Sequence, residues 1–465
     1  MSLADQLAQR ILATQFEHFP AEAIGWAKAA ILDTVGVTLA GAREDAPTMA
    51  GAALGVGAAA GPCLVFGGSR RVDPLSAALI NGTAAHALDY DDCSNSMGGH
   101  PSAPVLAALF ALGEQSHSSG RDILTAYVIG FEVEARIGRA VNLYHYEKGW
   151  HPTGTLGVFG AAAGCAKLLG LDAARTAVAL SIAASFSSGV KANFGSMVKP
   201  LHVGHCARNG MYAALLAREG FTSGAEVLEH KQGFLNVFNG AGNYDSSRLF
   251  DGWGAPFDIV APGIGFKQYP CCASTHPAVD CMMELRRKHD LRADQVALIE
   301  SWTHRRRLEH TNRPEPRSAL DAKFSVQYCL ARALLHGAIS IDHFEGDAWK
   351  DAATHALLRK VQAATYTEAQ FPPQNHFGAE VRVTLTDGRV FSAKVDQALG
   401  RDASTPLSPE MLRTKFVDCS ARILSYERIE RLHAVIEGFE RMADVSEMTA
   451  LIDTSSLAGK RRAVG

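Results

Sequence analysis

Val381-Arg-Val-Thr-Leu-Thr-Asp387-Gly388-Arg-Val-Phe391 is the stretch that separates this chain from an entirely helical protein. Apolar and polar side chains alternate on both sides of Asp387-Gly388, and a period of two is typical of a half-buried β-strand. An Asp-Gly pair between two such runs favours a tight turn. We therefore predict a β-hairpin over residues 380–395.

The hairpin lies in a region of mixed β and helical signals that begins near Pro262 and ends near residue 400. Residues 296–302 are predicted to form a further strand, and residues 322–335 a helix between the strands. Strands and helices that follow one another in this way are typical of an α+β domain. We expect such a domain, the smaller of two, over residues 263–403.

The chain on both sides of this region is predicted to be helical. In residues 1–262, Ala-rich segments alternate with short Gly and Pro turns, and small side chains allow helices to pack closely. Residues 404–465 return to helical signals, but periodicity alone does not assign this segment to either domain. A chain of 465 residues exceeds what one core usually serves, so two domains are expected. The predicted fold class is mainly α with an α+β part.

The composition excludes several classes of protein. The 45 Lys and Arg residues against 48 Asp and Glu give a formal charge of −3, without the basic excess of a nucleic-acid binder. The nine Cys lack the regular spacing of a disulfide scaffold and are expected to be reduced. Residues 1–15 lack the features of a secretory signal, and no uninterrupted apolar run reaches the roughly 18 residues of a membrane span. We expect a cytoplasmic protein with no membrane or nucleic-acid partner.

The common cofactor and metal motifs are missing from the sequence. There is no Gly-x-Gly-x-x-Gly after a strand, no phosphate loop and no Gly-x-Ser-x-Gly, and Cys271-Cys272 is adjacent rather than Cys-x-x-Cys. Asp89, Asp91 and Asp92 could suggest a divalent metal, although their spacing does not match a calcium loop. We therefore expect neither a metal nor an organic cofactor.

Ionisable residues gather instead in five short segments rich in Gly or Pro. They are 86–102, 149–154, 199–208, 267–277 and 310–314. In three segments a His precedes Pro, which holds the His out of helical geometry just before a helix-like stretch. Free N–H groups at helix N-termini attract carboxylates. A single His-Pro is more often only a turn, but the recurrence predicts a site for a multiply negative small molecule.

Taken together, these motifs resemble the MmgE/PrpD family, in the same order and from the first helices to about residue 400. The family includes 2-methylcitrate dehydratase, cis-aconitate decarboxylase and iminodisuccinate epimerase. The resemblance implies a large all-helical domain built from both chain ends, a smaller α+β lid, an active site in the cleft between them, and commonly a homodimer. It implies catalytic roles for Asp89, His100, His151, Lys199 and Lys267. The substrate-binding candidates beside them are His202, Arg208, His276, His310 and Arg313.

The chemistry implied by this resemblance is removal of a proton from carbon next to a carboxylate, without a nicotinamide, flavin or pyridoxal cofactor. Cations must stabilise the charge that develops, and a His or a desolvated Lys can act as the base. Our first interpretation is an epimerase of iminodisuccinate type acting on a dicarboxylate. The alternative is a lyase that dehydrates 2-methylcitrate or decarboxylates cis-aconitate. A non-catalytic carboxylate-binding protein is a third possibility.

Two departures from the family pattern bear on the substrate. Residues 93–99 lack the Trp that dehydratase members usually carry before Gly99-His100-Pro-Ser, which argues against 2-methylcitrate. Cys93 follows the Asp pair, where decarboxylase members usually have Thr.

Overall fold

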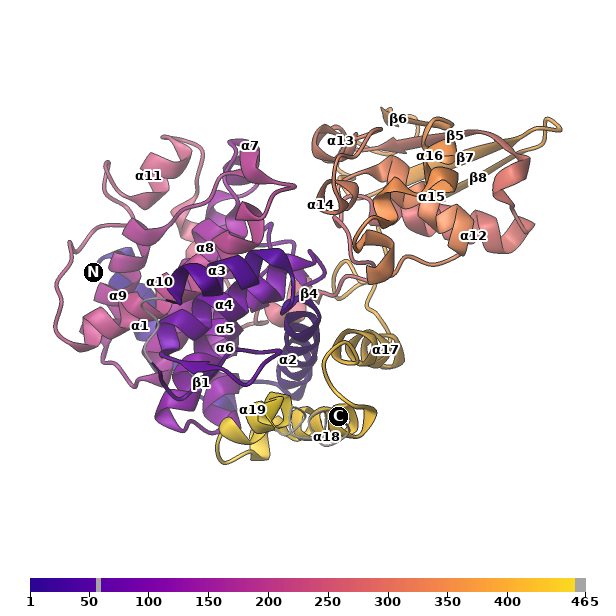
Figure 1. Ribbon diagram of the computed structural model, residues 1–465. Coiled ribbons are helices and arrows are strands. Elements are labelled where there is room, and N and C mark those ends of the chain that lie inside the picture. Colours follow the sequence, from indigo (N-terminus) through magenta and orange to yellow (C-terminus); the bar gives the residue numbers. More distant parts are fainter. Residues whose placement is uncertain (56–59, 456–465) are drawn as a thin grey trace, which may run out of the picture. The chain divides into compact units, whose positions relative to one another are not determined.

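The computed structural model describes residues 1–55 and 60–455 and divides into two compact units (Figure 1). The helical unit comprises Met1–Ala87, Asp91–Phe266 and the chain from Ser408 onward. The mixed unit comprises Lys267–Leu407 together with Leu88–Tyr90. The sequence had placed the boundaries at 262/263 and 403/404 and had not singled out residues 88–90. The predicted fold class, mainly α with a small α+β part, is confirmed.

The helical unit is built around five long helices that pack on one another. These central helices are α4 (Pro74–Ala87), α5 (Ser102–Ser116), α6 (Gly120–Val141), α8 (Pro152–Leu168) and α10 (Val198–Arg218). Further helices of the first half are α1 (Leu3–Ala13), α3 (Asp45–Leu54), α7 (Tyr144–Glu147), α9 (Ala173–Phe186) and α11 (Phe234–Asn239). Most side chains of α5, α6 and α8 are buried, as their Ala-rich sequences predict.

Glycine allows α4 and α10 to approach closely. A Cβ added to Gly204 on α10 would lie 2.1 Å from the carbonyl oxygen of Leu79 and 2.3 Å from Thr83 Oγ1 on α4. A Cβ on Gly82 would lie 2.9 Å from the Cα of Gly204. Any larger side chain would push these helices apart. This contact sets the separation of α4 and α10, both of which carry residues of the candidate site.

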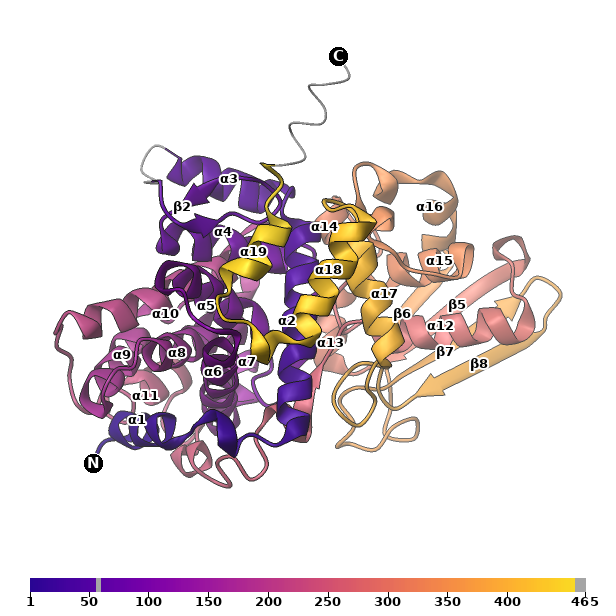
Figure 2. The ribbon, with the colours of Figure 1, turned by 90° about the horizontal axis from the view of Figure 1, so that it is seen from below.

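An N-terminal and a C-terminal segment of the chain meet in the helical unit, where α2 (Ala21–Gly41) packs against α17 (Pro409–Ser420) (Figure 2). A buried ion pair joins them, with Lys415 Nζ 2.6 Å from Asp33 Oδ1. The last helices are α18 (Tyr426–Glu437) and α19 (Ser446–Ile452). Among the described residues α2 alone is long and apolar enough to span a membrane, but 72% of its apolar window is buried, as in a core helix.

The mixed unit contains a four-stranded sheet with the order β6-β5-β7-β8. The strands are β5 (Val296–Thr303), β6 (Val361–Thr365), β7 (Ala379–Leu385) and β8 (Val390–Val395). β7 and β8 form the predicted antiparallel hairpin, and β6 runs parallel to β5. Gly388, in the turn between β7 and β8, has φ of +89°, a conformation that glycine adopts without strain.

Helices pack against this sheet and complete the core of the mixed unit (Figure 1). The helices of this unit are α12 (His276–His289), α13 (Arg305–Thr311), α14 (Ala319–Ala322), α15 (Val326–His336) and α16 (Ala352–Leu358). The helix predicted over 322–335 begins four residues later, at Val326, where the Ser325 side chain accepts a hydrogen bond from the backbone N–H of Tyr328. Such a side-chain acceptor is a preferred N-cap.

The expectation of an all-helical first domain needs a small correction. Two pairs of two-residue strands lie in the helical unit, β1 (Cys63–Leu64) with β2 (Arg71–Val72), and β3 (Cys93–Ser94) with β4 (Ile264–Gly265). Two residues are too few to show an alternating pattern, so the sequence carried no signal for them.

Candidate active site

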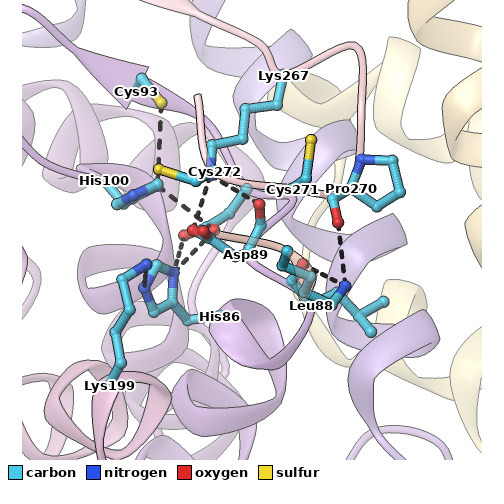
Figure 3. A network of polar contacts seen from close by, with 12 residues as sticks. His86, Leu88, Asp89, Cys93, His100, Lys199, Lys267, Pro270, Cys271 and Cys272 are labelled. Carbon is cyan, nitrogen blue, oxygen red and sulfur yellow. Dashed lines mark hydrogen bonds and ion pairs between the residues drawn. The ribbon is translucent and has the colours of Figure 1, made fainter. Parts of the chain in front are cut away.

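A line of buried polar contacts in the helical unit starts from His86 at the end of α4. His86 Nδ1 lies 2.8 Å from both carboxylate oxygens of Asp91. His86 Nε2 lies 2.9 Å from Lys199 Nζ (Figure 3). All three side chains are nearly inaccessible to solvent. Because the carboxylate accepts from Nδ1, the Nε2 atom is left to accept from the Lys199 ammonium. A carboxylate, an imidazole and an ammonium group are thus linked in series.

His100 joins this line from the turn before α5. Its Nδ1 atom is 3.4 Å from Asp91 Oδ1, and its ring centre is 4.5 Å from that of His86. The backbone N–H of His100 donates to Thr153 Oγ1 at 3.1 Å. Asp91 therefore contacts two imidazoles, and His100 is the more accessible of the two, with 12% of its side chain exposed.

His151 and His202 form a second pair of imidazoles in the same unit. Their Nδ1 atoms are 3.1 Å apart, and the ring centre of His151 is 5.8 Å from that of His86. Burial, followed by the charge of Lys199, holds the pKa of His151 well below its usual value. Burial, then His86 and Lys199, lowers the pKa of His202 to about 4. Both imidazoles are therefore neutral near pH 7.

The Nε2 atom of His151 has no hydrogen-bond partner among the described residues, although it is buried. A buried nitrogen of this kind is costly unless something else satisfies it. His151 thus offers a neutral nitrogen that can exchange a proton with a bound molecule.

A separate network lies at the first turn of α8, whose N-cap is His151. Asn239 donates from Nδ2 to the carbonyl of Leu235 at 2.9 Å, so its Oδ1 faces Nδ1 of His145, also at 2.9 Å. His145 must then donate from Nδ1 and accept at Nε2 from the Thr155 hydroxyl, 2.7 Å away. Burial lowers the pKa of His145 to about 4, which keeps it neutral. His145 is a positioning residue for the first turn of α8.

Asp89 and Lys267 form a buried ion pair within the mixed unit. Lys267 Nζ donates to Oδ1 and to the backbone carbonyl of Asp89, both at 2.7 Å (Figure 3). Asp89 has a left-handed φ of 52°, which aspartate tolerates better than most residues. Lys323 holds the neighbouring backbone by donating to the carbonyls of Leu88 at 2.9 Å and Pro270 at 3.1 Å. Residues 88–90 are thereby tied to this unit.

Four of the predicted substrate-binding residues are Arg208 in the helical unit and His276, His310 and Arg313 in the mixed unit. Arg208 is nine residues after Lys199 on α10, about 180° around the helix, so it points away from Lys199. In the mixed unit, His276 Nε2 is buried 3.2 Å from the carbonyl of Cys271. His310 Nε2 is 3.0 Å from Ser274 Oγ, and Arg313 pairs with Asp321.

Sequence reasoning underrated His86, Asp91 and His145. The first two lie in segment 86–102, one of the five segments in which ionisable residues gather, but their central position depends on Lys199, which is 113 residues from His86. His145 lies outside these five segments. A possible signal was its place six residues before His151, in a segment with three aromatic residues.

Comparison with known proteins gives matches over almost the whole chain. Residues 5–247 match the MmgE/PrpD N-terminal domain, and residues 269–440 match the MmgE/PrpD C-terminal domain. The chain is 31% identical to cis-aconitate decarboxylase of Homo sapiens, covering 97% of this chain and 94% of that one. It is 28% identical to cis-aconitate decarboxylase of Aspergillus terreus, covering 94% and 93%. It is 23% identical to mitochondrial 2-methylcitrate dehydratase of Yarrowia lipolytica, covering 82% and 78%.

Proposed function

Because this protein belongs to the MmgE/PrpD family, we propose that it is a lyase that removes CO₂ from a small unsaturated tricarboxylate such as cis-aconitate. The protein is an enzyme of a family that acts on carboxylic acids. The relatives named above are decarboxylases and a dehydratase, so the lyase alternative is better supported than the epimerase of our first interpretation. The predicted homodimer and cytoplasmic location stay predictions.

The structural observation that supports this proposal is the neutral Nε2 of His151, which has no hydrogen-bond partner among the described residues and lies in a cluster with Lys199, because such a nitrogen can exchange a proton with a bound polyanion. The same cationic surroundings that lower the pKa of His151 in the free protein attract a polyanion. A bound tricarboxylate would reverse the balance, because nearby negative charge favours the protonated imidazole. Substrate binding would therefore load a proton onto His151 at the moment when an acid is needed.

The reaction can be written from general chemistry. In cis-aconitate, one carboxylate sits on a saturated carbon next to the C=C bond. When its C–C bond breaks, CO₂ leaves and the electron pair spreads through the double bond to the carbon that bears another carboxylate. A proton added there gives a methylene-substituted succinate, so a trianion and one proton yield CO₂ and a dianion. Lys199 would stabilise the delocalised charge, and His151 or His100 would supply the proton.

Dehydration of a hydroxy-tricarboxylate is the second candidate function. A neutral imidazole with a free nitrogen also suits a base that takes a proton next to a carboxylate, while His100 protonates the departing hydroxyl. The 23% identity to a 2-methylcitrate dehydratase supports this candidate less strongly than the decarboxylases support the first. Asp89 and Lys267 are retained as proposed catalytic residues on the resemblance of their motifs.

Incubation of the purified protein with cis-aconitate, with 2-methylcitrate and with a dicarboxylate of iminodisuccinate type in deuterated water separates these possibilities. Decarboxylation predicts CO₂ release and a product with one deuterium on the carbon beside a carboxylate, seen by NMR. Dehydration predicts an alkene without CO₂. Solvent deuterium entering the dicarboxylate, or inversion of its stereocentre, with no loss of CO₂ or water, would favour the epimerase. No reaction with any of these acids would favour a binding role.

A further inference from the structure

We propose that His86, Asp91 and His100 form a binding site for one divalent transition-metal ion of the Zn²⁺ class, and that this ion inhibits the enzyme reversibly. The ligand atoms of these residues all lie within 4.8 Å of one another in the helical unit. The Nδ1 atoms of both imidazoles face the same carboxylate, at 2.8 and 3.4 Å. From the sequence, a divalent metal at Asp89, Asp91 and Asp92 is considered but not expected, because their spacing matches no calcium loop and the histidines follow no metal-finger spacing.

The separation of Asp91 from His100 matches that which a small divalent ion imposes on its ligands, and the separation of Asp91 from His86 is shorter. With metal–ligand bonds of about 2.0–2.2 Å, neighbouring atoms in a tetrahedral site are about 3.3–3.5 Å apart. The 3.4 Å between Asp91 Oδ1 and His100 Nδ1 lies in this range, whereas the 2.8 Å between Asp91 Oδ1 and His86 Nδ1 is a hydrogen-bond distance and would have to lengthen by about 0.5 Å. An ion between the three atoms therefore requires a shift of the His86 or Asp91 side chain by that amount.

The ligand types narrow the choice of ion. Two imidazole nitrogens and one carboxylate suit Zn²⁺, Co²⁺, Ni²⁺ or Fe²⁺. Mg²⁺ and Ca²⁺ prefer ligand sets made of oxygen. Burial also favours the site, because His86 and Asp91 are held by packing and need little ordering on binding.

The charge of Lys199 is the reason that we expect the ion to act as an inhibitor rather than as a tightly held cofactor. Its ammonium group lies 2.9 Å from Nε2 of His86, where a metal-binding His usually donates to a carboxylate or carbonyl. This positive charge opposes the ion and weakens binding enough for EDTA to reverse it. A bound ion would replace the His86 Nδ1 hydrogen bond and the His100 Nδ1 contact with Asp91, and so break the line from Asp91 through His86 to Lys199.

Co²⁺ is the probe for the test, because tetrahedral Co²⁺ gives visible absorption bands that report its ligands. The full-length protein is treated with EDTA, freed of chelator and titrated with Co²⁺, and Zn²⁺ is then added as a competitor. We expect one Co²⁺ per chain, displaced by Zn²⁺. His100→Gln and Asp91→Asn should each weaken binding by about tenfold or more. His433→Gln should not, although His433 Nδ1 also lies near a carboxylate, 3.6 Å from Glu437.

Several outcomes would overturn the proposal. The first is that Co²⁺ gives no visible band with the native protein. The second is that both His100→Gln and Asp91→Asn keep the wild-type affinity for Co²⁺. The third is a near-ultraviolet thiolate band, which would place the ion on cysteines. Circular dichroism identifies a variant that fails to fold, and the two variants serve as checks on each other. With substrate, Zn²⁺ should lower turnover and EDTA should restore it; binding without inhibition would refute the inhibitory role. The Co²⁺ titration uses no substrate, so its result does not depend on the proposed lyase activity.

Discussion

Replacing Lys199 with Met is expected to lower turnover by about a hundredfold to a thousandfold. The side chain is 4% exposed, and its Nζ atom lies 2.9 Å from His86 Nε2, so its charge acts in a site shielded from water. A unit charge about 4 Å from a developing negative charge is worth about 4 kcal/mol at an effective dielectric constant of about 20. Loss of one such group typically costs about 10²–10³ in turnover. Met has a similar length and should preserve the packing of α10.

The same change has a second consequence, which distinguishes an electrostatic role from a purely structural one. After burial, Lys199 is the largest cause of the low pKa of His151. Without the ammonium group, the pKa of His151 should rise, and the apparent pKa in the pH profile of kcat/KM should move to higher pH. Steady-state kinetics across pH measures both effects, with exposed Lys231→Met as the matched control. A Lys199→Met protein that keeps more than about a third of wild-type turnover, or an unshifted profile, would refute the reasoning.

Three further predictions concern the fold that supports the site. Asp89→Asn and Lys267→Met should each lower the free energy of unfolding, measured in urea, by about 3–5 kcal/mol, because each leaves one buried charge unpaired. The double variant should lose less than either single variant, and equal losses in all three proteins would contradict this explanation. Gly204→Ala should destabilise α4 against α10 and lower turnover, whereas Gly25→Ala on α2, with nothing near its added Cβ, should melt no lower than wild type. The unfolding free energy should fall as pH drops from about 6.5 to 4, because native His145, with its pKa of about 4, binds fewer protons than the same residue in the unfolded chain. In His145→Gln, the loss of unfolding free energy over this interval should be smaller by about 3 kcal/mol. An unchanged loss would show that His145 is not responsible.

Several features of the fold could be predicted from local sequence. The alternation around Asp387-Gly388 predicted the hairpin, because the side-chain period of a strand and the needs of a tight turn are local properties. Ala-rich stretches likewise predicted the closely packed helices. The segments around His100, His151 and Lys199 indicated these three residues through their resemblance to a family.

Other features came only from the folded chain. The sequence did not indicate that His86 would contact Lys199, 113 residues away, or that Lys267 would pair with Asp89, 178 residues away. It could not indicate that His151 would be neutral, since that follows from burial beside Lys199. Local sequence determines which conformations a segment prefers. Distances between remote segments and the exclusion of water arise only when the helices pack, and these two quantities control the charge and reactivity of a side chain.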